Sequence, residues 1–219
     1  MNKALGCGGV LILVLLIFGI SGCGSYNRLV QMDQEVNKKW ADVQSVYQRR
    51  ADLIPNLVNT VAGAANFEKS TLTEVTNARA SVGQVKLDPS KAPTDAAQLA
   101  EFQKAQGQLS TALSRLLVVS EQYPQLRATE NFQNLQKELE GTENRISVER
   151  NNFNTAVQAF NTAVRSFPTN LLAGMFGFQP RPFFNAQPNA DKAPEVKFDF
   201  NKPSAATAPT PATTPVATP

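Results

Sequence analysis

The sequence predicts an all-α protein: an antiparallel helical bundle of about four helices, with long first and last helices, an N-terminal membrane anchor and a disordered C-terminal tail. Three observations lead to this prediction. Apolar residues recur at steps of three and four, prolines separate these runs, and both ends differ in composition from the middle. We divide the chain into a signal peptide or membrane anchor (1–22), a bundle with a C-terminal apolar segment (23–187) and a Pro/Ala/Thr-rich tail (188–219).

The N-terminus has the layout of a secretory signal. Lys3 precedes an apolar stretch, which ends in residues 20–23 with the sequence Ile-Ser-Gly-Cys. This run resembles a bacterial lipobox, in which a cysteine after small residues is lipidated and becomes the new N-terminus. Cys23 is therefore the candidate lipidation site, and its acyl chains would hold the protein to membrane lipid.

An uncleaved transmembrane helix is the alternative for the same segment. Residues 4–22 come close to the roughly 20 apolar residues that a membrane span requires. Arg28, Lys38 and Lys39 outnumber Lys3, which favours a cytoplasmic bundle by the positive-inside rule, whereas the lipobox favours the periplasmic side. We expect an extracytoplasmic lipoprotein, with a single-pass inner-membrane protein as the alternative. The chain is tethered in both cases.

The helices follow from the apolar seams. The first seam runs from Leu29 to Val61 with the near-heptad spacing of a coiled coil, and Pro55 within it predicts a kink rather than an end. A shorter pattern occupies residues 67–82, and the proline-containing segment 83–94 predicts a loop.

Two more helices complete the predicted bundle. One begins near Asp95 and stops at Pro124, and the last begins at Thr129, a plausible N-cap, and stops at Pro168. Residues 170–184 are too apolar for a free tail, so we expect them to fold back over one bundle end. Seven asparagines in the last helix predict either interhelical amide hydrogen bonds or a partner-binding face.

Polar residues interrupt the seams at core-type positions. Counted from the turns, several of them lie ~14 to 18 residues along their helices, and therefore at one level of the bundle. We predict a polar layer in which an arginine meets a glutamate, drawn from Arg50, Arg79, Gln106, Glu143 and Glu149. A buried ion pair that fixes helix register and a ligand pocket both remain open as its role.

Composition argues against several classes of function. The sequence has no histidine, so the commonest general base and metal ligand are missing, and neither a phosphate-binding glycine loop nor a metal or cofactor site is evident. Its net charge of +3 is spread along the chain, which makes nucleic acid a poor candidate partner. We expect no enzyme activity, and carboxylate-based hydrolysis remains as the least favoured hypothesis.

Residues 49–58, with the sequence RRADLIPNLV, strongly resemble the LemA family. The similarity extends to other runs between residues 26 and 185: YNRLV (26–30), EVTNAR (74–79), TENRI (142–146), FPTNL (167–171) and FGFQPR (176–181). It implies an N-terminally anchored, largely helical bundle at the bacterial envelope, with no established catalytic residues or cofactor. The lipobox at Cys23 and the Pro/Ala/Thr-rich tail depart from the usual family pattern.

The leading functional hypothesis is a membrane-tethered, non-catalytic interaction or scaffold module that docks an unknown envelope protein. A charged run beside Pro55 and an apolar segment rimmed by polar residues supply the candidate contacts, which are Arg49, Asp52, Asn56, Phe176, Phe178 and Arg181. The alternative is a small-ligand-binding bundle that uses the polar layer.

Overall fold

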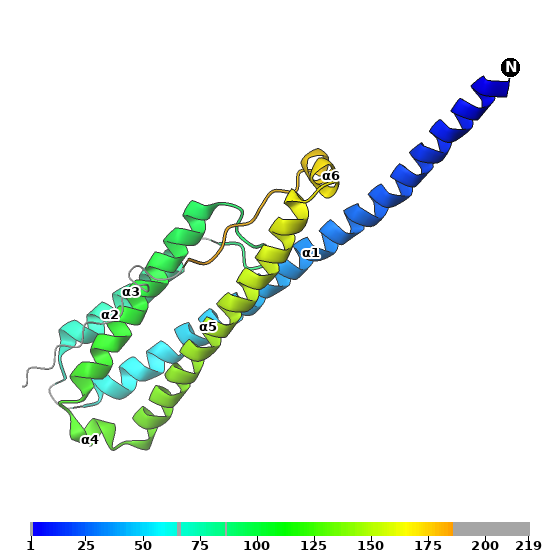
Figure 1. The fold of residues 1–219 in the computed structure, drawn as a ribbon. Coiled ribbons are helices and arrows are strands. Elements are labelled where there is room, and N and C mark those ends of the chain that lie inside the picture. Colours follow the sequence, from blue (N-terminus) through cyan, green and yellow to red (C-terminus); the bar gives the residue numbers. More distant parts are fainter. Residues whose placement is uncertain (1, 65–66, 86, 186–219) are drawn as a thin grey trace, which may run out of the picture. The chain divides into compact units, whose positions relative to one another are not determined.

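The computed structural model describes residues 2–64, 67–85 and 87–185, with side chains from residue 24 onward. Within these ranges every regular element is a helix (Figure 1). The helices are α1 (Asn2–Ala62), α2 (Lys69–Gln84), α3 (Ala96–Ser120), α4 (Pro124–Arg127), α5 (Glu130–Arg165) and α6 (Thr169–Phe176). The expected helical bundle is confirmed.

The long helices α1 and α5 pack along each other, and α2 packs on α3 (Figure 1). Along α1 the buried apolar side chains recur at the steps that the sequence indicates, at Leu29, Val36, Trp40, Val43, Tyr47, Ile54, Leu57 and Val61. The helix continues through Pro55 and reaches back to Asn2, so residues 2–22 and the bundle share one continuous helix.

The helix boundaries have local causes. Asp95 caps α3, because its carboxylate accepts a hydrogen bond of 2.8 Å from the backbone N–H of Ala97. Thr129 occupies the N-cap position of α5, but its hydroxyl donates to the carbonyl oxygen of Leu126 instead of capping. The short helix α4, which the sequence analysis did not separate from the turn, provides that carbonyl.

The segment after α5 turns back onto the bundle. Gly177 ends α6 with φ of 76°, a left-handed conformation that glycine adopts without a steric penalty. Residues 178–184 then run back, without helical structure, alongside α5. We call these residues the strap.

The buried apolar residues form two clusters along the bundle. The proximal core, on the side nearer residue 24, contains Leu29, Val36, Trp40, Val43, Tyr47, Ala92, Leu99, Phe102, Ile146, Phe153, Val157, Phe160, Val164, Ala173 and Phe184. The distal core contains Ile54, Leu57, Val61, Phe67, Val75, Leu109, Ala112, Leu113, Leu116, Leu126, Phe132 and Leu139. On each of α1, α3 and α5, polar residues separate the two clusters.

Candidate functional site: the polar layer and the clasp

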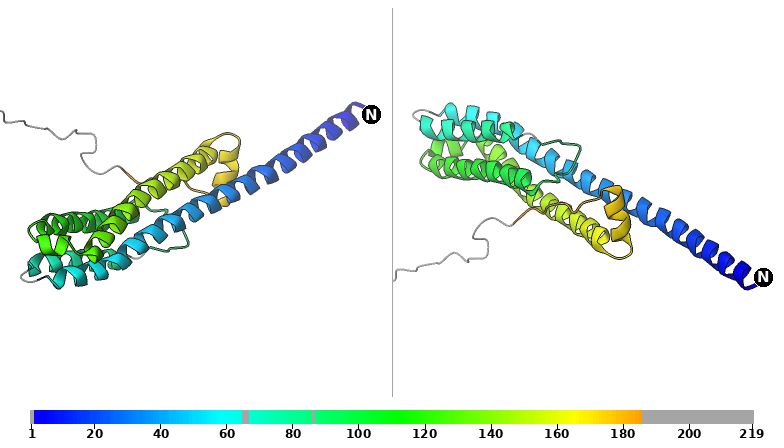
Figure 2. Two further views of the ribbon diagram at one scale, coloured as in Figure 1. Left: turned by 90° about the horizontal axis from the view of Figure 1, so that it is seen from below. Right: turned by 90° about the horizontal axis from the view of Figure 1, so that it is seen from above.

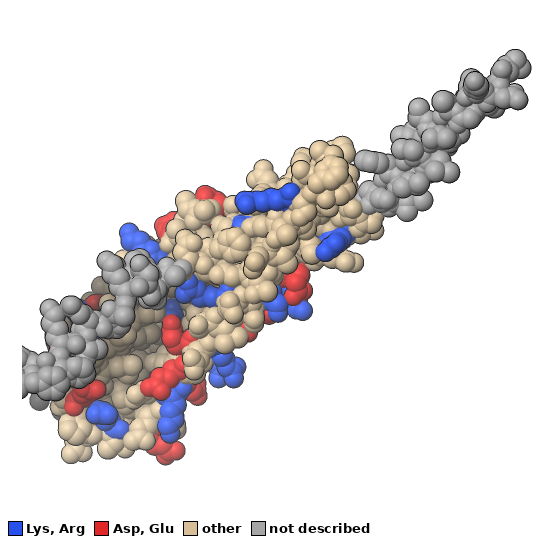
Figure 3. Space-filling view, viewed as in Figure 1, with Lys and Arg blue, Asp and Glu red and all other residues tan. Residues whose placement is uncertain are grey.

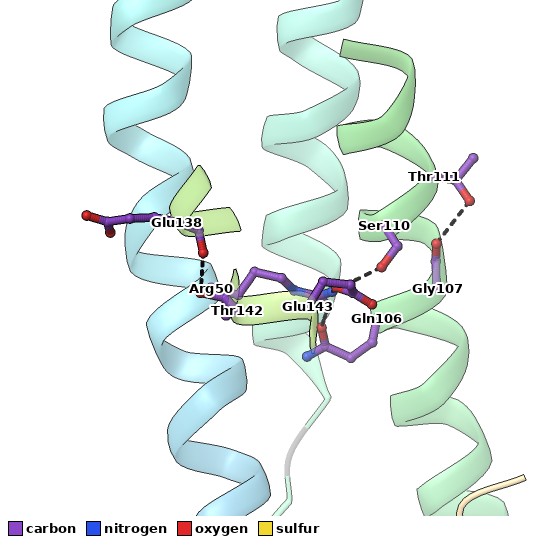
Figure 4. A network of polar contacts seen from close by, with 8 residues as sticks. All are labelled: Arg50, Gln106, Gly107, Ser110, Thr111, Glu138, Thr142 and Glu143. Carbon is purple, nitrogen blue, oxygen red and sulfur yellow. Dashed lines mark hydrogen bonds and ion pairs between the residues drawn. The ribbon is translucent and has the colours of Figure 1, made fainter. Parts of the chain in front are cut away.

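Arg50 of α1 is the centre of the polar layer. It is only 2% exposed, and the guanidinium donates to partners on two other helices. Its Nη1 lies 2.7 Å from Glu143 Oε2 on α5 and 3.0 Å from Ser110 Oγ on α3, and its Nη2 donates to Gln106 Oε1 (Figure 4). The structure therefore brings together three of the residues that the sequence analysis places in this layer, and it adds Ser110.

One end of the polar layer is buried and the other is exposed to solvent. The side chain of Glu143 is 55% exposed, whereas that of Arg50 is 3% exposed, so the ion pair reaches from the interior to solvent. The guanidinium also lies 5.2 Å from the ring centroid of Tyr47. Burial raises the pKa of the Tyr47 phenol, although the positive charges of Arg150 and Arg50 oppose that rise. The buried guanidinium thus links α1 to both α3 and α5.

Two residues expected in the layer lie outside it. The first is Arg79, which binds the backbone of α1 near Pro55. Because Pro55 has no N–H, the carbonyl oxygen of Ala51 lacks the backbone hydrogen-bond donor that a regular helix places four residues later. Arg79 of α2 provides a substitute, because its Nε donates to that oxygen over 3.1 Å. Glu149 instead accepts a hydrogen bond of 3.0 Å from Asn152 Nδ2, one turn further along α5. Arg79 lies beside the layer but binds the backbone of α1, and Glu149 lies six residues beyond Glu143 on α5, ~9 Å along the axis.

The candidate interaction surface divides in two. Arg49, Asp52 and Asn56 lie exposed on α1, with Asp52 Oδ1 accepting a hydrogen bond of 2.8 Å from Gln48. Phe176 is also exposed. Phe178, by contrast, is partly buried against the proximal core, and its ring lies 6.4 Å from that of Phe160.

Arg181, which the sequence analysis assigns to the interaction surface, is used inside the fold. Its Nη2 lies 2.7 Å from Asp33 Oδ1 of α1, and its Nη1 donates over 2.9 Å to the carbonyl oxygen of Ala92 in the loop before α3. The side chains of Arg181 and Asp33 are 14% and 19% exposed. Arg181 therefore ties the strap to α1 and to the loop, which corrects its assignment as a contact for a partner.

Two asparagines of α5 hold the strap by its backbone. The amide of Asn161 donates to the carbonyl oxygen of Arg181 over 2.8 Å and accepts from its N–H over 2.7 Å. Asn154 makes the same pair of hydrogen bonds with Phe184, at 3.0 and 2.9 Å. Asn154 and Asn161 thus bind an extended segment, whereas the sequence analysis expected either interhelical hydrogen bonds or a partner-binding face. We call Arg181, Asp33, Asn154 and Asn161 the clasp.

The same end of the bundle fixes the loop before α3. Trp40 Nε1 donates over 3.0 Å to the carbonyl oxygen of Asp88, and Asn37 Oδ1 accepts from the N–H of Ala92 over 3.0 Å. The ring of Trp40 lies 5.7 Å from that of Phe153 and 6.1 Å from that of Phe184. Sequence reasoning missed Asp33, Asn37 and the indole N–H of Trp40 as polar contacts, because their partners are backbone atoms or distant residues.

Two grooves among the described residues lie away from the polar layer. A groove of about 630 Å³ opens at the far end of the bundle, between Thr60, Tyr123, Leu126 and neighbouring residues. A smaller one of about 140 Å³ lies between α1 and α5, beside Arg28, Ser166 and Thr169.

The carboxylates considered for hydrolysis have separate partners. Glu143 pairs with Arg50, Glu149 accepts from Asn152, and Glu140 Oε1 accepts a hydrogen bond of 3.0 Å from Gln136. Among the described residues, no group of three or more acidic or cysteine side chains is placed to hold a metal ion.

The predicted membrane anchor and the predicted disordered tail occupy the two ends of the chain. The side chains of residues 1–23, including the candidate lipidation site Cys23, lie outside the described residues. The tail at 188–219 lies outside them too, because the described part of the chain ends at Asn185. Among the residues whose side chains the structure describes, no helix is both long and apolar enough to cross a membrane.

Comparisons with known proteins extend the resemblance seen in the sequence. Magnetosome proteins MamQ 1 and MamQ 2 of Paramagnetospirillum magneticum are each 25% identical over 185 residues, covering 76% of this chain and 66% of the relative. Protein LemA of Metamycoplasma hominis is 25% identical over 162 residues, covering 74% of this chain and 69% of the relative. The chain thus spans just under two thirds of the length of the two MamQ relatives.

The family assignment depends on a broader match. The profile of the LemA family matches residues 39–198, which is more than half of the chain and includes α2 to α6, the polar layer and most of the clasp. Together with the all-helical fold, this match places the protein among the LemA-type proteins of the bacterial envelope. The chain belongs to the LemA family.

Proposed function

We propose that the chain is a membrane-tethered, non-catalytic interaction module, whose bundle docks another envelope protein through one face of α1. One observation carries the proposal. The run at residues 49–58 carries the family resemblance, and the fold buries only part of it: Arg50, Ile54 and Leu57 lie inside the bundle. Arg49, Asp52 and Asn56 lie outside, where folding does not require them.

The exposed part of this run forms a coherent surface. Residues three and four apart on a helix share a face, so Arg49, Asp52 and Asn56 project to one side of α1. The helix beneath them is held by the ion pair between Arg50 and Glu143 and by the bond from Arg79 to Ala51. A rigid face with one positive, one negative and one amide group suits recognition by a partner of complementary charge.

The N-terminal segment, residues 1–23, would provide the membrane tether. Lipidation at Cys23 or an uncleaved span over residues 4–22 would each hold α1 at the membrane, on the periplasmic side in the first case. Mass spectrometry of the mature N-terminus separates the two. An acylated cysteine at position 23 supports the lipoprotein, an intact Met1 supports the span, and a mature chain that begins after residue 23 without lipid contradicts the tether.

The docking face is tested by exchanging its charges. In the full chain, Arg49→Glu with Asp52→Lys reverses both charges and keeps the net charge constant. The matched control is Glu101→Lys with Lys104→Glu, an exposed pair with the same spacing on α3. Each variant is expressed in its native membrane, cross-linked in cells and purified through a tag.

The expected result is selective loss of a partner. A protein that cross-links to the wild type and to the α3 control, but roughly ten-fold less to the α1 variant, supports the docking face. If the same proteins are recovered in equal amount with all three chains, this face of α1 is not the contact. Circular dichroism of each purified chain checks that the bundle is intact.

A further inference from the structure

Apolar side chains are exposed at one place in particular, around α6. Phe167, Leu171, Met175 and Phe176 are 80%, 60%, 72% and 54% exposed. Leu171 and Met175 are four residues apart, so they form a stripe along one side of α6, and Phe167 is exposed in the turn before that helix. Single exposed apolar residues are ordinary, but four within ten residues form a patch that requires an explanation.

The stripe is the outer side of a short helix whose polar residues, Thr169 and Asn170, lie in the first turn, and whose other side chains are apolar. Ala173 is buried and Leu172 is partly buried on the side that faces α1 and α5. A surface helix normally turns its apolar side toward the core and polar side chains toward solvent. In α6 the bundle covers one side and leaves the other open, which indicates a second apolar surface in the working protein.

The position of α6 indicates what that surface is. The ring of Phe176 lies 4.7 Å from that of Tyr26 on α1, and both views in Figure 2 show α6 beside α1. Tyr26 follows Cys23 by three residues in a continuous helix, which corresponds to ~4.5 Å along the axis. Whether the tether is the lipid on Cys23 or a span that ends at residue 22, it would bring α6 to the membrane surface.

The charges around α6 are suited to a membrane. Residues 24–32 and 162–180 include two arginines, Arg28 and Arg165, and no aspartate or glutamate. Both arginines are exposed, and Arg28 lines the small groove beside Ser166 and Thr169. Figure 3 shows the surface over α6 free of acidic side chains in that view. Anionic lipid headgroups attract such isolated positive charges.

We propose that α6 lies in the membrane interface, with Leu171 and Met175 inserted at the boundary between headgroups and acyl chains, and with Arg28 and Arg165 against anionic headgroups. This inference rests on the proposed tether and adds a second contact that fixes the tilt of the bundle. A tether alone leaves the tilt of the bundle relative to the membrane plane less restricted. A second contact through α6 would restrict that tilt.

The test places a tryptophan in the stripe of the full chain. The one native tryptophan, Trp40, is fully buried and provides a constant background. Met175→Trp and Leu171→Trp each probe α6, and Val118→Trp on α3, where Val118 is 65% exposed, is the matched control. Each chain is reconstituted into vesicles of phosphatidylcholine and phosphatidylglycerol, with brominated or plain acyl chains, and flotation measures vesicle binding.

We expect brominated lipid to lower, roughly two-fold, the emission that the added tryptophan contributes above the Trp40 background in the two α6 variants, because quenching requires the indole to reach the acyl boundary. The wild type and the Val118→Trp chain should change little. Adding Arg28→Gln and Arg165→Gln to the Met175→Trp chain should reduce quenching in vesicles with phosphatidylglycerol more than in pure phosphatidylcholine.

Three results would overturn the inference. If the α6 variants float with the vesicles but are quenched no more than Val118→Trp, the tether stands and α6 lies away from lipid. If a dimer in detergent becomes a monomer on Leu171→Glu, the stripe is the contact with a second copy. If no chain floats with the vesicles, the tether and the inference fail together.

Discussion

On the distal side of Arg50 the core is enclosed by helices, whereas on the proximal side the strap and the loop before α3 take the place of a helix. Phe184 of the strap and Ala92 of the loop are members of the proximal core, while α2 and α4 contribute Val75 and Leu126 to the distal core. A helix satisfies its own backbone groups, but an extended segment does not. The backbone of the strap and of the loop is therefore bound by polar side chains from the neighbouring helices.

The contacts follow this difference. In the proximal half, the clasp and the indole of Trp40 bind backbone groups that lie 20 to 89 residues away in sequence. In the distal half, apolar packing is supplemented by pairs on the surface, such as Arg115 with Glu74 at 2.8 Å. The two halves share α1, α3 and α5, and Arg50 lies where they meet.

The largest effects should come from emptying either core. Phe153 and Leu116 are fully buried, on the proximal and distal sides. Phe153→Ala should lower the free energy of unfolding by about 3–5 kcal/mol and Leu116→Ala by about 2–5 kcal/mol, since each leaves a cavity. Because three helices pass through both halves, urea unfolding followed by circular dichroism should remain a single transition. Two separate transitions would show that the halves unfold independently.

The next effect concerns the boundary between the halves. Arg50→Ala leaves a cavity and removes the partners of Gln106, Ser110 and Glu143, so it should cost about 3 kcal/mol, the lower end for a broken buried pair, because Glu143 reaches solvent. Arg49→Ala, its exposed neighbour, should stay within about 0.5 kcal/mol. Urea unfolding measures both, and equal stabilities for the two variants would show that the layer contributes nothing.

The clasp should have a smaller and more local effect. Asn161→Ala removes two hydrogen bonds to Arg181 and should cost about 2 kcal/mol. Hydrogen exchange should rise in the strap but not in α2. Asn144→Ala, an exposed asparagine on the same helix, is the control and should change neither quantity. Increased exchange throughout the bundle would mean that the strap is part of one cooperative unit.

Arg79 tests the junction between α1 and α2. Arg79→Ala should cost about 0.5–1 kcal/mol, because the carbonyl oxygen of Ala51 then loses its donor. In a chain that also carries Pro55→Ala, the backbone N–H of residue 55 is restored and the cost of losing Arg79 should shrink. A double-mutant cycle in urea measures this coupling. Additive effects of the two changes would contradict it.

The weakest effect should be seen only in alkali. Burial raises the pKa of Tyr47 above its value of about 10 in the unfolded chain, so the neutral phenol favours folding below pH ~10 and this contribution is lost as the pH rises through the folded pKa. Stability should therefore fall between pH 9 and pH 11 more steeply in the wild type than in Tyr47→Phe, which keeps the ring against Phe102. Parallel curves would place the phenol in a polar environment.

The helical core could be predicted from sequence because its cause is local. The steps of three and four that mark Val36, Trp40 and Val43 depend only on helix geometry, and Asp95 caps α3 through its own side chain. The pairing of Arg50 with Glu143, 93 residues apart, could be anticipated because Arg50 interrupts one apolar seam and Glu143 adjoins Thr142, which interrupts another at the same level.

The clasp could not be predicted in the same way. Asp33 and Arg181 are 148 residues apart, and nothing in the pattern around either residue identifies the other. Arg79 lies next to the layer but projects toward the backbone of α1, and Glu149 lies ~9 Å further along α5 than Glu143. One signal was present: Asn154 and Asn161 lie seven residues apart on the buried side of an otherwise apolar seam.

That spacing of seven has a consequence for how the strap and α5 can vary. Two turns of helix separate Asn154 from Asn161, ~10.5 Å along the axis, and three extended residues separate Arg181 from Phe184, ~10 Å. The two distances are nearly equal, so the strap can hydrogen-bond to Asn154 and to Asn161 at the same time without a distorted backbone. Deleting one strap residue would leave a shortfall of ~3.3 Å, and point substitutions between the two amides should be tolerated where a change of length is not.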